Sequence, residues 1–366
     1  MALGGPTVSI LTSGIGLGVY IPALLIQRQM QALGAAAEAL TLEAYYTEEG
    51  RQRHLQHQQA FHQNFALAQL GNRMARGVDS RLDKPRLDDL LWAWAGQGRR
   101  CFIVWSGFWL PILERYRAMV GYQVHVDCCR IDAMVSASFR RYTELESGSS
   151  EIWLWNWEKR RLAYEIAVDE RSPIAFTDRD RRLVVHGGGW GMGTYREIHH
   201  DLARTPWLLD TVVHDRAEAI HVRAQDRTFM VDPDWRTWHR GPHGLTFPPF
   251  GEVHGESAPA ARDEHALYQV IRHSKAIVSK PGGGTLIDSL SSATPVVLLD
   301  PFGQAEGRNG ALWQHLGFGI PYATWQEHGY DEEPLARLHE NLLRARRRGT
   351  DYPRYCIERL QNGAWS

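Results

Sequence analysis

The sequence has no excess of charge of one sign: 41 lysine and arginine side chains face 42 aspartate and glutamate side chains, a formal net charge of -1. This balance argues against nucleic acid as a partner. No apolar run reaches the roughly 18–20 residues of a membrane span, and the opening residues lack the basic and apolar segments of a signal peptide. Four cysteines are too few for a disulfide framework. We therefore predict a cytoplasmic protein with no transmembrane segment.

Strand-like and helix-like patterns alternate along the first half of the chain. Short apolar runs predict buried strands at residues 7–12, 38–44, 101–105 and 122–127. Helical patterns separate them, for example ALLIQRQMQAL, which Pro22 precedes and Gly34 follows. Such alternation is typical of a parallel sheet in a doubly wound domain.

The pattern restarts after a polar, proline-containing segment at residues 171–182, which we expect to be a linker. Further strands are predicted at residues 183–188, 219–223, 227–232, 275–280 and 295–302. The predicted fold class is therefore α/β, with two Rossmann-like doubly wound domains. We expect them at residues 1–175 and 183–345, with a C-terminal helical segment at 346–366 that packs back on the first domain.

Three junctions between a strand and a helix are rich in glycine, at residues 14–18, 187–193 and 282–284. Such junctions expose backbone amides at a helix N-terminus, where the helix dipole favours an anion. Any one of them can equally be a tight turn. Three in two α/β halves favour a ligand that carries phosphate.

The first junction partly fits the dinucleotide-binding fingerprint. Its glycines are spaced G-x-G-x-G, and Val19 stands where the third glycine of the fingerprint belongs. Glu43, at the end of the second predicted strand, could hold a ribose. A nicotinamide-dependent oxidoreductase is therefore an alternative.

The third junction, SKPGGGTLIDSL at residues 279–290, has Asp288 three positions after Thr285. This spacing fits a capping box, in which the two side chains satisfy amides at the start of a helix. The same carboxylate could instead accept hydrogen bonds from a ribose. We expect Asp288 to do both.

The segment KPGGGTLIDSLSSATPVVLLDPFGQAEGRNGALWQHLG resembles the donor-binding region of two-domain (GT-B) nucleotide-sugar glycosyltransferases. It is especially similar to the N-acetylglucosaminyltransferase of bacterial cell-wall synthesis and to UDP-glycosyltransferases. The resemblance implies the GT-B architecture, two domains facing a cleft, with the glycines near the diphosphate and Asp288 on the ribose. The residues expected to bind the donor are Gly189, Trp190, Gly191, Arg196, Lys280, Gly282, Gly283, Gly284, Thr285, Asp288, Glu306 and Asn309.

The first half is similar to the acceptor domain of this family, from which it departs at two places. The family's histidine in the first glycine loop is replaced by Val19, and its H-E-Q-N motif by residues 127–130, Asp-Cys-Cys-Arg. The catalytic base is therefore expected to be Asp127, at the end of a strand, with Glu43 in reserve. The residues expected to bind the acceptor are Gly16, Trp105, Ser106 and Trp109.

These observations predict an inverting glycosyltransferase that needs no metal. Its donor would be a nucleotide sugar, with UDP as the expected nucleotide, and no other cofactor is expected. Its acceptor would be a small molecule, a peptide or a lipid-linked molecule. A non-catalytic nucleotide-sugar-binding partner protein is the second alternative, because the family's histidine is missing.

Overall fold

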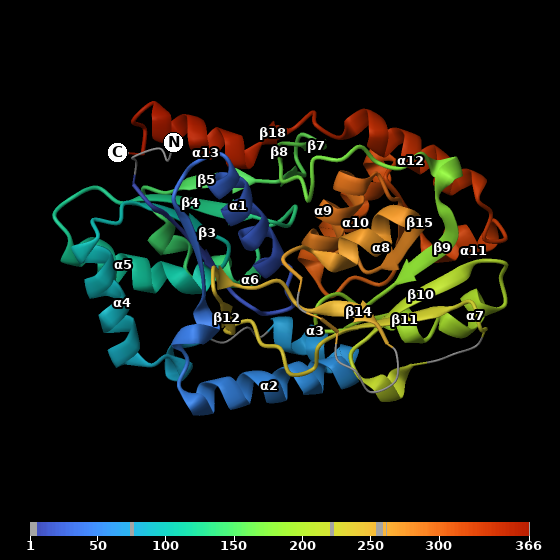
Figure 1. Ribbon diagram of the computed structural model, residues 1–366, viewed down its shortest axis with the longest axis horizontal. Coiled ribbons are helices and arrows are strands. Elements are labelled where there is room, and N and C mark those ends of the chain that lie inside the picture. The colour runs from blue at the N-terminus through green and yellow to red at the C-terminus, as the bar shows by residue number, and fades with distance from the viewer. Residues whose placement is uncertain (1–5, 74–76, 220–222, 254–258, 261, 366) are drawn as a thin grey trace.

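The computed structural model describes residues 6–73, 77–219, 223–253, 259–260 and 262–365. Its two main sheets are formed by separate stretches of the chain and lie in two halves, seen side by side in Figure 1. Their mixed α/β composition and mainly parallel strands agree with the predicted fold class.

The first sheet has the strand order β2-β1-β3-β4-β5, and its neighbouring strands are parallel. Every residue of β1 and β3 is buried, as expected of central strands that helices cover on both faces. The strands are β1 (Val8–Thr12), β2 (Ala37–Thr41), β3 (Cys101–Val104), β4 (His125–Arg130) and β5 (Ser150–Trp153). The helices of this half are α1 (Tyr20–Ala32), α2 (Glu48–Gln63), α3 (Phe65–Arg73), α4 (Lys84–Gly96), α5 (Leu110–Met119) and α6 (Ala137–Arg140).

The second sheet has the order β14-β11-β10-β9-β15-β16-β17, in which only the edge strand β14 is antiparallel among the described pairs. Its strands are β9 (Asp180–Val185), β10 (Leu208–Val213), β11 (Arg227–Val231), β14 (Phe250–Glu252), β15 (Ser274–Ser279), β16 (Val296–Leu298) and β17 (Gly319–Pro321). The helices of this half are α7 (His199–Ala203), α8 (Ala266–His273), α9 (Gly283–Ser292), α10 (Gln304–Leu316), α11 (Tyr322–Glu327) and α12 (Glu333–Ala345).

Short strands pair outside the main sheets: β6 (Trp155–Asn156) with β7 (Arg161–Leu162), β12 (Arg240–Gly241) with β13 (Gly244–Leu245), and β8 (Tyr164–Glu165) with β18 (Thr350–Asp351). The C-terminal helix α13 (Tyr352–Gln361) returns to the first half and lies along it in Figure 1. Arg359 Nη1 donates to both carboxylate oxygens of Asp127, at 2.8 and 2.7 Å, and the Tyr352 hydroxyl donates to Oδ2 at 2.9 Å. This buried ion pair holds the end of the chain against the middle of β4.

Three features of the elements differ from the sequence-based prediction. Strand β4 continues past Asp127 to Arg130. The helical pattern of residues 54–74, HLQHQQAFHQNFALAQLGNRM, predicts one helix, but the described part forms two, α2 and α3. Asn64 between them is extended, and its side chain accepts from the amide of Leu67 at the start of α3. Strand β10 was not predicted, and residues 220–222 of the strand expected at 219–223 lie outside the described residues.

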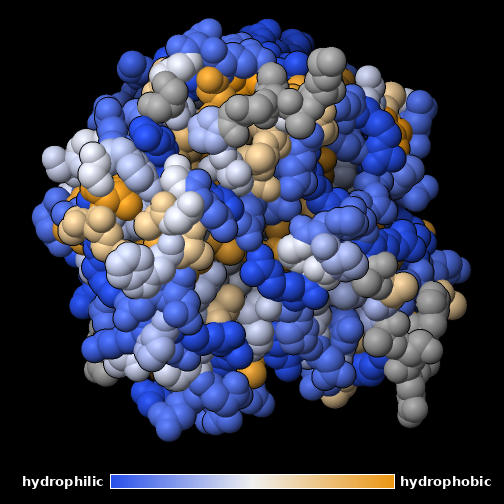
Figure 2. Space-filling view, turned by 60° about the vertical axis from the view of Figure 1, so that its left-hand side comes forward, coloured by the Kyte–Doolittle hydropathy of each residue, from blue (hydrophilic) through white to orange (hydrophobic). Residues whose placement is uncertain are grey.

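The face of the molecule in Figure 2 is mostly hydrophilic, and its hydrophobic residues form small separate patches. Among the described helices, none has the length and apolar character that crossing a membrane requires. All four cysteines are buried and unpaired.

Candidate functional site

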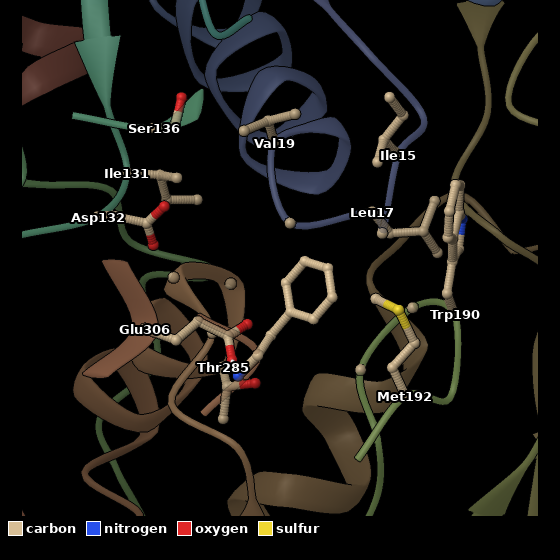
Figure 3. Close-up of a pocket in the computed structure, with 18 of the residues that line it drawn as sticks. Ile15, Leu17, Val19, Ile131, Asp132, Ser136, Trp190, Met192, Thr285 and Glu306 are labelled. Atoms are coloured by element: carbon tan, nitrogen blue, oxygen red, sulfur yellow. Dashed lines mark hydrogen bonds between the residues drawn. The ribbon is translucent and has the colours of Figure 1, made fainter. Parts of the chain in front are cut away.

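A cavity of about 1380 Å³ lies between the two halves. Its walls come from the loops after β1, β3 and β4 on one side and after β9, β15 and β16 on the other. These are the carboxyl ends of parallel strands, where doubly wound folds bind their ligands. Figure 3 shows Val19 and Leu17 of the first glycine loop facing Thr285 and Glu306 of the second half across this space.

The N-terminus of α9 forms one wall of the cavity. Gly282 is its N-cap, and no side chain of the described residues caps the first turn. Thr285 is the third residue of the helix and Asp288 lies one turn later, too far to bond the N-cap amide. The predicted capping box is therefore wrong. The first-turn amides and the positive end of the helix dipole are left for a ligand.

Asp288 lines the cavity from the second turn of α9, with 5% of its surface exposed. Its carboxylate contacts Nε2 of His265 at 3.1 Å. The His265 ring stacks on Phe247, with centroids 6.3 Å apart. His265 could not be identified as a site residue from the sequence, because it belongs to no glycine loop and contacts Asp288 only in the folded chain.

Lys280 and Glu306 form an ion pair on the same wall, with 2.6 Å between Nζ and Oε1. The other carboxylate oxygen of Glu306 accepts from the amide of Phe302 at 2.7 Å, which fixes the carboxylate. An anionic ligand can compete with Glu306 for the Lys280 ammonium. The site thus has a buried lysine beside the N-terminus of α9, whose ammonium pairs with Glu306 in the free protein.

Two of the expected ligand-binding glycines line the cavity and also let the two halves approach each other. A Cβ on Gly189 would lie 2.4 Å from the carbonyl oxygen of Gly16 and 2.5 Å from Cβ of Leu17. A Cβ on Gly283 would lie 2.8 Å from the carbonyl oxygen of Ile131. The glycine loops of the two halves are therefore in direct contact around the cavity.

Two residues expected at the donor, Gly191 and Arg196, are not among the described residues that line the cavity. Trp190, directly before Gly191 in the same loop, does line the cavity. The carbonyl oxygens of Trp190 and Gly191 lie 3.1 Å from Nδ1 of His62, on α2 of the other half. Arg196 contacts the His62 ring and forms an ion pair with Glu218 at 3.1 Å. This part of the second glycine loop joins the halves.

Asn309 is fully buried and also joins the two halves. Its Oδ1 accepts from the amide of Ala133 at 2.7 Å, and its Nδ2 donates to Asp132 at 2.7 Å and to the carbonyl of Pro281 at 3.0 Å. It is not among the described lining residues. It supports the site by holding the end of β4 beside α9.

Neither expected base lines the cavity among the described residues. Asp127 lies within β4 and is buried against Arg359 and Tyr352. The expectation that it ends the strand at the ligand site is wrong, because β4 is longer than predicted. Glu43 is also buried: it accepts from the Ser13 hydroxyl at 2.6 Å and the Gly14 amide at 2.8 Å, and so shapes the first glycine loop.

Asp132, in the loop that follows β4, is an acid of the first half that lines the cavity. In Figure 3 it lies next to Ile131, on the side of the cavity where Glu306 also lies. Burial, against the lowering effect of the hydrogen bond from Asn309, raises the pKa of Asp132 to about 6; within this net shift the charge of Glu306 raises the pKa and that of Lys280 lowers it. The sequence analysis did not single out Asp132 because it placed the end of the strand at Asp127, whereas β4 continues to Arg130.

Three of the four expected acceptor residues, Gly16, Trp105 and Ser106, line the cavity. Trp109 does not; it is buried, and its indole N–H donates to the carbonyl of Thr12 at 2.7 Å. Apolar side chains form much of the cavity wall on both halves, namely Ile15, Leu17, Val19, Phe61, Phe108, Phe139, Trp190 and Met192. Within the described part of the chain, no group of three or more His, Cys, Asp or Glu residues is arranged to hold a metal ion.

No protein-family model and no curated protein matches the chain. Solved structures do match it along almost the whole length. MurG from Acinetobacter baumannii has a TM-score of 0.51 at 12% identity, covering 98% of this chain and 99% of the other. The spinosyn rhamnosyltransferase SpnG complexed with thymidine diphosphate has 0.56 at 11%, covering 97% and 100%. A UDP-glucosyltransferase from Polygonum tinctorium has 0.53 at 11%, covering 98% and 99%. The chain therefore has the two-domain GT-B fold of these glycosyltransferases.

Proposed function

We propose that this protein is a glycosyltransferase that moves a sugar from a nucleotide sugar bound by the second half to an acceptor held by the first. The observation that carries the proposal is the N-terminus of α9 on the cavity wall, which no described side chain caps and which Asp288 follows one turn later. A helix N-terminus binds a diphosphate through its free amides. A carboxylate one turn further on can accept hydrogen bonds from the two hydroxyls of a ribose.

The donor we propose is a UDP-sugar. The part of the cavity near His265 is lined by Val231, Pro248, Phe250 and Ala266, which would provide an apolar slot for a flat base. Two of the structural neighbours involve pyrimidine nucleotides: one is a UDP-glucosyltransferase and one was solved with thymidine diphosphate. The slot and these neighbours together favour a pyrimidine nucleotide.

The departing nucleoside diphosphate would be stabilised by charges that the chain itself supplies. The amides of Gly283, Gly284 and Thr285 and the dipole of α9 would face the diphosphate, and Lys280 would approach it by leaving Glu306. Glu306 would then be free to accept hydrogen bonds from the hydroxyls of the sugar. On this basis we propose transfer that does not require a metal.

The base we propose is Asp132, in place of Asp127 and Glu43. In an inverting transfer the acceptor oxygen bonds to the anomeric carbon from the side opposite the diphosphate and gives up its proton to a base. Asp132 lies at the cavity, on the acceptor half, close enough to Asn309 of the donor half to share a hydrogen bond. Val19, which replaces the family's histidine, also lines the cavity but cannot accept a proton.

Of the alternatives, the nicotinamide-dependent oxidoreductase is disfavoured by the surroundings of the first glycine loop. Glu43, which would have to hold the ribose, already bonds Ser13 and Gly14 and is fully buried. A non-catalytic nucleotide-sugar-binding protein would present the same donor site and differ only in turnover.

Thermal denaturation with UDP, dTDP, GDP, NAD and NADP tests the class of ligand, because a ligand that binds only the folded state raises the melting temperature. We expect UDP to raise it most. UDP release from UDP-glucose and UDP-N-acetylglucosamine, measured with and without a mixture of phenolic and alcoholic acceptors, then tests for turnover. Stabilisation by NAD or NADP alone would contradict the proposal. Binding of UDP without turnover on any donor or acceptor would favour the binding protein.

A further inference from the structure

We infer that His186, at the end of β9, donates a hydrogen bond through Nε2–H to the diphosphate of the bound nucleotide. This inference rests on the proposed function and adds a residue that neither the glycine loops nor the family resemblance identified. His186 lines the cavity and is 3% exposed. Among the described residues its Nε2 has no hydrogen-bond partner.

The tautomer of His186 follows from its other ring nitrogen. Nδ1 lies 3.0 Å from the amide nitrogen of Gly188, and an amide can only donate. Nδ1 must therefore be the acceptor, so a neutral ring carries its proton on Nε2. Burial, followed by the positive charge of Lys280, lowers the pKa of His186 to about 3. The ring is therefore neutral at physiological pH, and Nε2 is a donor.

A buried N–H without a partner is unfavourable in the free protein, and a ligand that supplies an acceptor atom removes this penalty. Such unpaired donors are uncommon in folded proteins. Because the ring of His186 lines the cavity, a bound ligand that reaches the buried Nε2 can supply the missing acceptor.

The surroundings of His186 favour a phosphate oxygen as that acceptor. A Cβ on Gly188, the residue that bonds Nδ1, would lie 3.5 Å from Nζ of Lys280. Lys280 directly precedes the loop that leads into α9. The charge of Lys280 acts on the His186 ring, so once Lys280 leaves Glu306 an anionic oxygen is more stable here than a hydroxyl of the sugar or the ribose.

Two substitutions separate the donor role of His186 from its support of the loop. In His186→Asn, the side-chain oxygen can still accept from the amide two residues on, as asparagine does in turns, but no group reaches the Nε2 position. In His186→Gln, the amide nitrogen reaches the position of Nε2 as a donor. The probes are UDP and uridine, whose binding is measured by calorimetry, and thermal denaturation checks that each variant is folded.

We expect His186→Asn to bind UDP about tenfold more weakly, or about 1.4 kcal/mol, with its affinity for uridine and its melting temperature unchanged. His186→Gln should recover most of the affinity for UDP. Wild-type affinity for UDP in His186→Asn, or an equal loss for UDP and uridine, would overturn the assignment while the proposed function stands. If the unsubstituted protein binds no nucleoside diphosphate, the assignment of His186 and the proposed function are both wrong.

Discussion

At the scale of single residues, the proposed function assigns the ribose of the donor to the carboxylate of Asp288. We expect Asp288→Asn to weaken UDP binding by about 1–3 kcal/mol, the range for a hydrogen bond that involves a charged group. The melting temperature should change little, because the side chain does not cap α9. The control is Asp300→Asn, which removes one charge from the same cavity but lies outside α9. Equal losses in both variants would mean that only the net charge of the cavity matters.

Asp132 gives the account a predicted pH dependence. Its raised pKa, about 6, means that the carboxylate is ionised and able to accept a proton above this pH and is protonated below it. The kcat/KM of an active donor and acceptor pair should therefore fall as the pH drops through about 6. Asp132→Asn should lower turnover by about 10²–10⁴-fold. The fall of kcat/KM on acidification should disappear in this variant. Unchanged turnover in this variant, or the same fall of kcat/KM below about pH 6, would exclude Asp132 as the base.

Asp127 should matter for stability rather than for turnover. Asp127→Asn removes the charge that pairs with Arg359 and weakens the attachment of α13, so we expect a loss of about 2–3 kcal/mol in the free energy of unfolding. Urea denaturation measures this loss, and UDP affinity below the transition should stay at the wild-type value. If Asp127→Asn is as stable as the wild type but its turnover is greatly reduced, Asp127 is again a candidate for the catalytic base.

At the scale of elements, contact between glycine loops sets how closely the halves approach. Gly189→Ala would place a methyl group against the backbone of Gly16, so the loops must move apart, and we expect about 1–3 kcal/mol of destabilisation. Gly18→Ala is the matched control, because its Cβ would meet nothing within 4 Å. Thermal or urea denaturation compares the two variants. Equal stability of the two variants would show that the contact of Gly189 with the first glycine loop does not limit how closely the halves approach.

The elements also show how far the sequence determines the site. The strand that leads into Gly282–Thr285 was predictable, because an apolar run, a glycine cluster and a helical pattern follow one another locally. Three features could not be read from local pattern: the true end of β4, the contact of His265 with Asp288, and the insertion of Asn309 between the halves. Each depends on a partner far away in the chain. Strand ends are also decided by pairing with neighbours, which here extends β4 along β5.

At the scale of the whole molecule, the two halves are held together on both sides of the cavity. His62 of α2 contacts the second glycine loop, and Asn309 of α10 contacts the end of β4. Helix α13 crosses back and fixes the chain end to the first half (Figure 1). The cavity is therefore built by both halves at once, as the proposed transfer between a donor and an acceptor would require.

The central claim is that this cavity binds a nucleotide sugar with its diphosphate at the N-terminus of α9. A crystal structure of the protein with UDP tests it most directly. The account predicts the diphosphate on the amides of Gly283, Gly284 and Thr285, and the ribose on Asp288. UDP bound at the first glycine loop, or bound with its diphosphate away from α9, would contradict it.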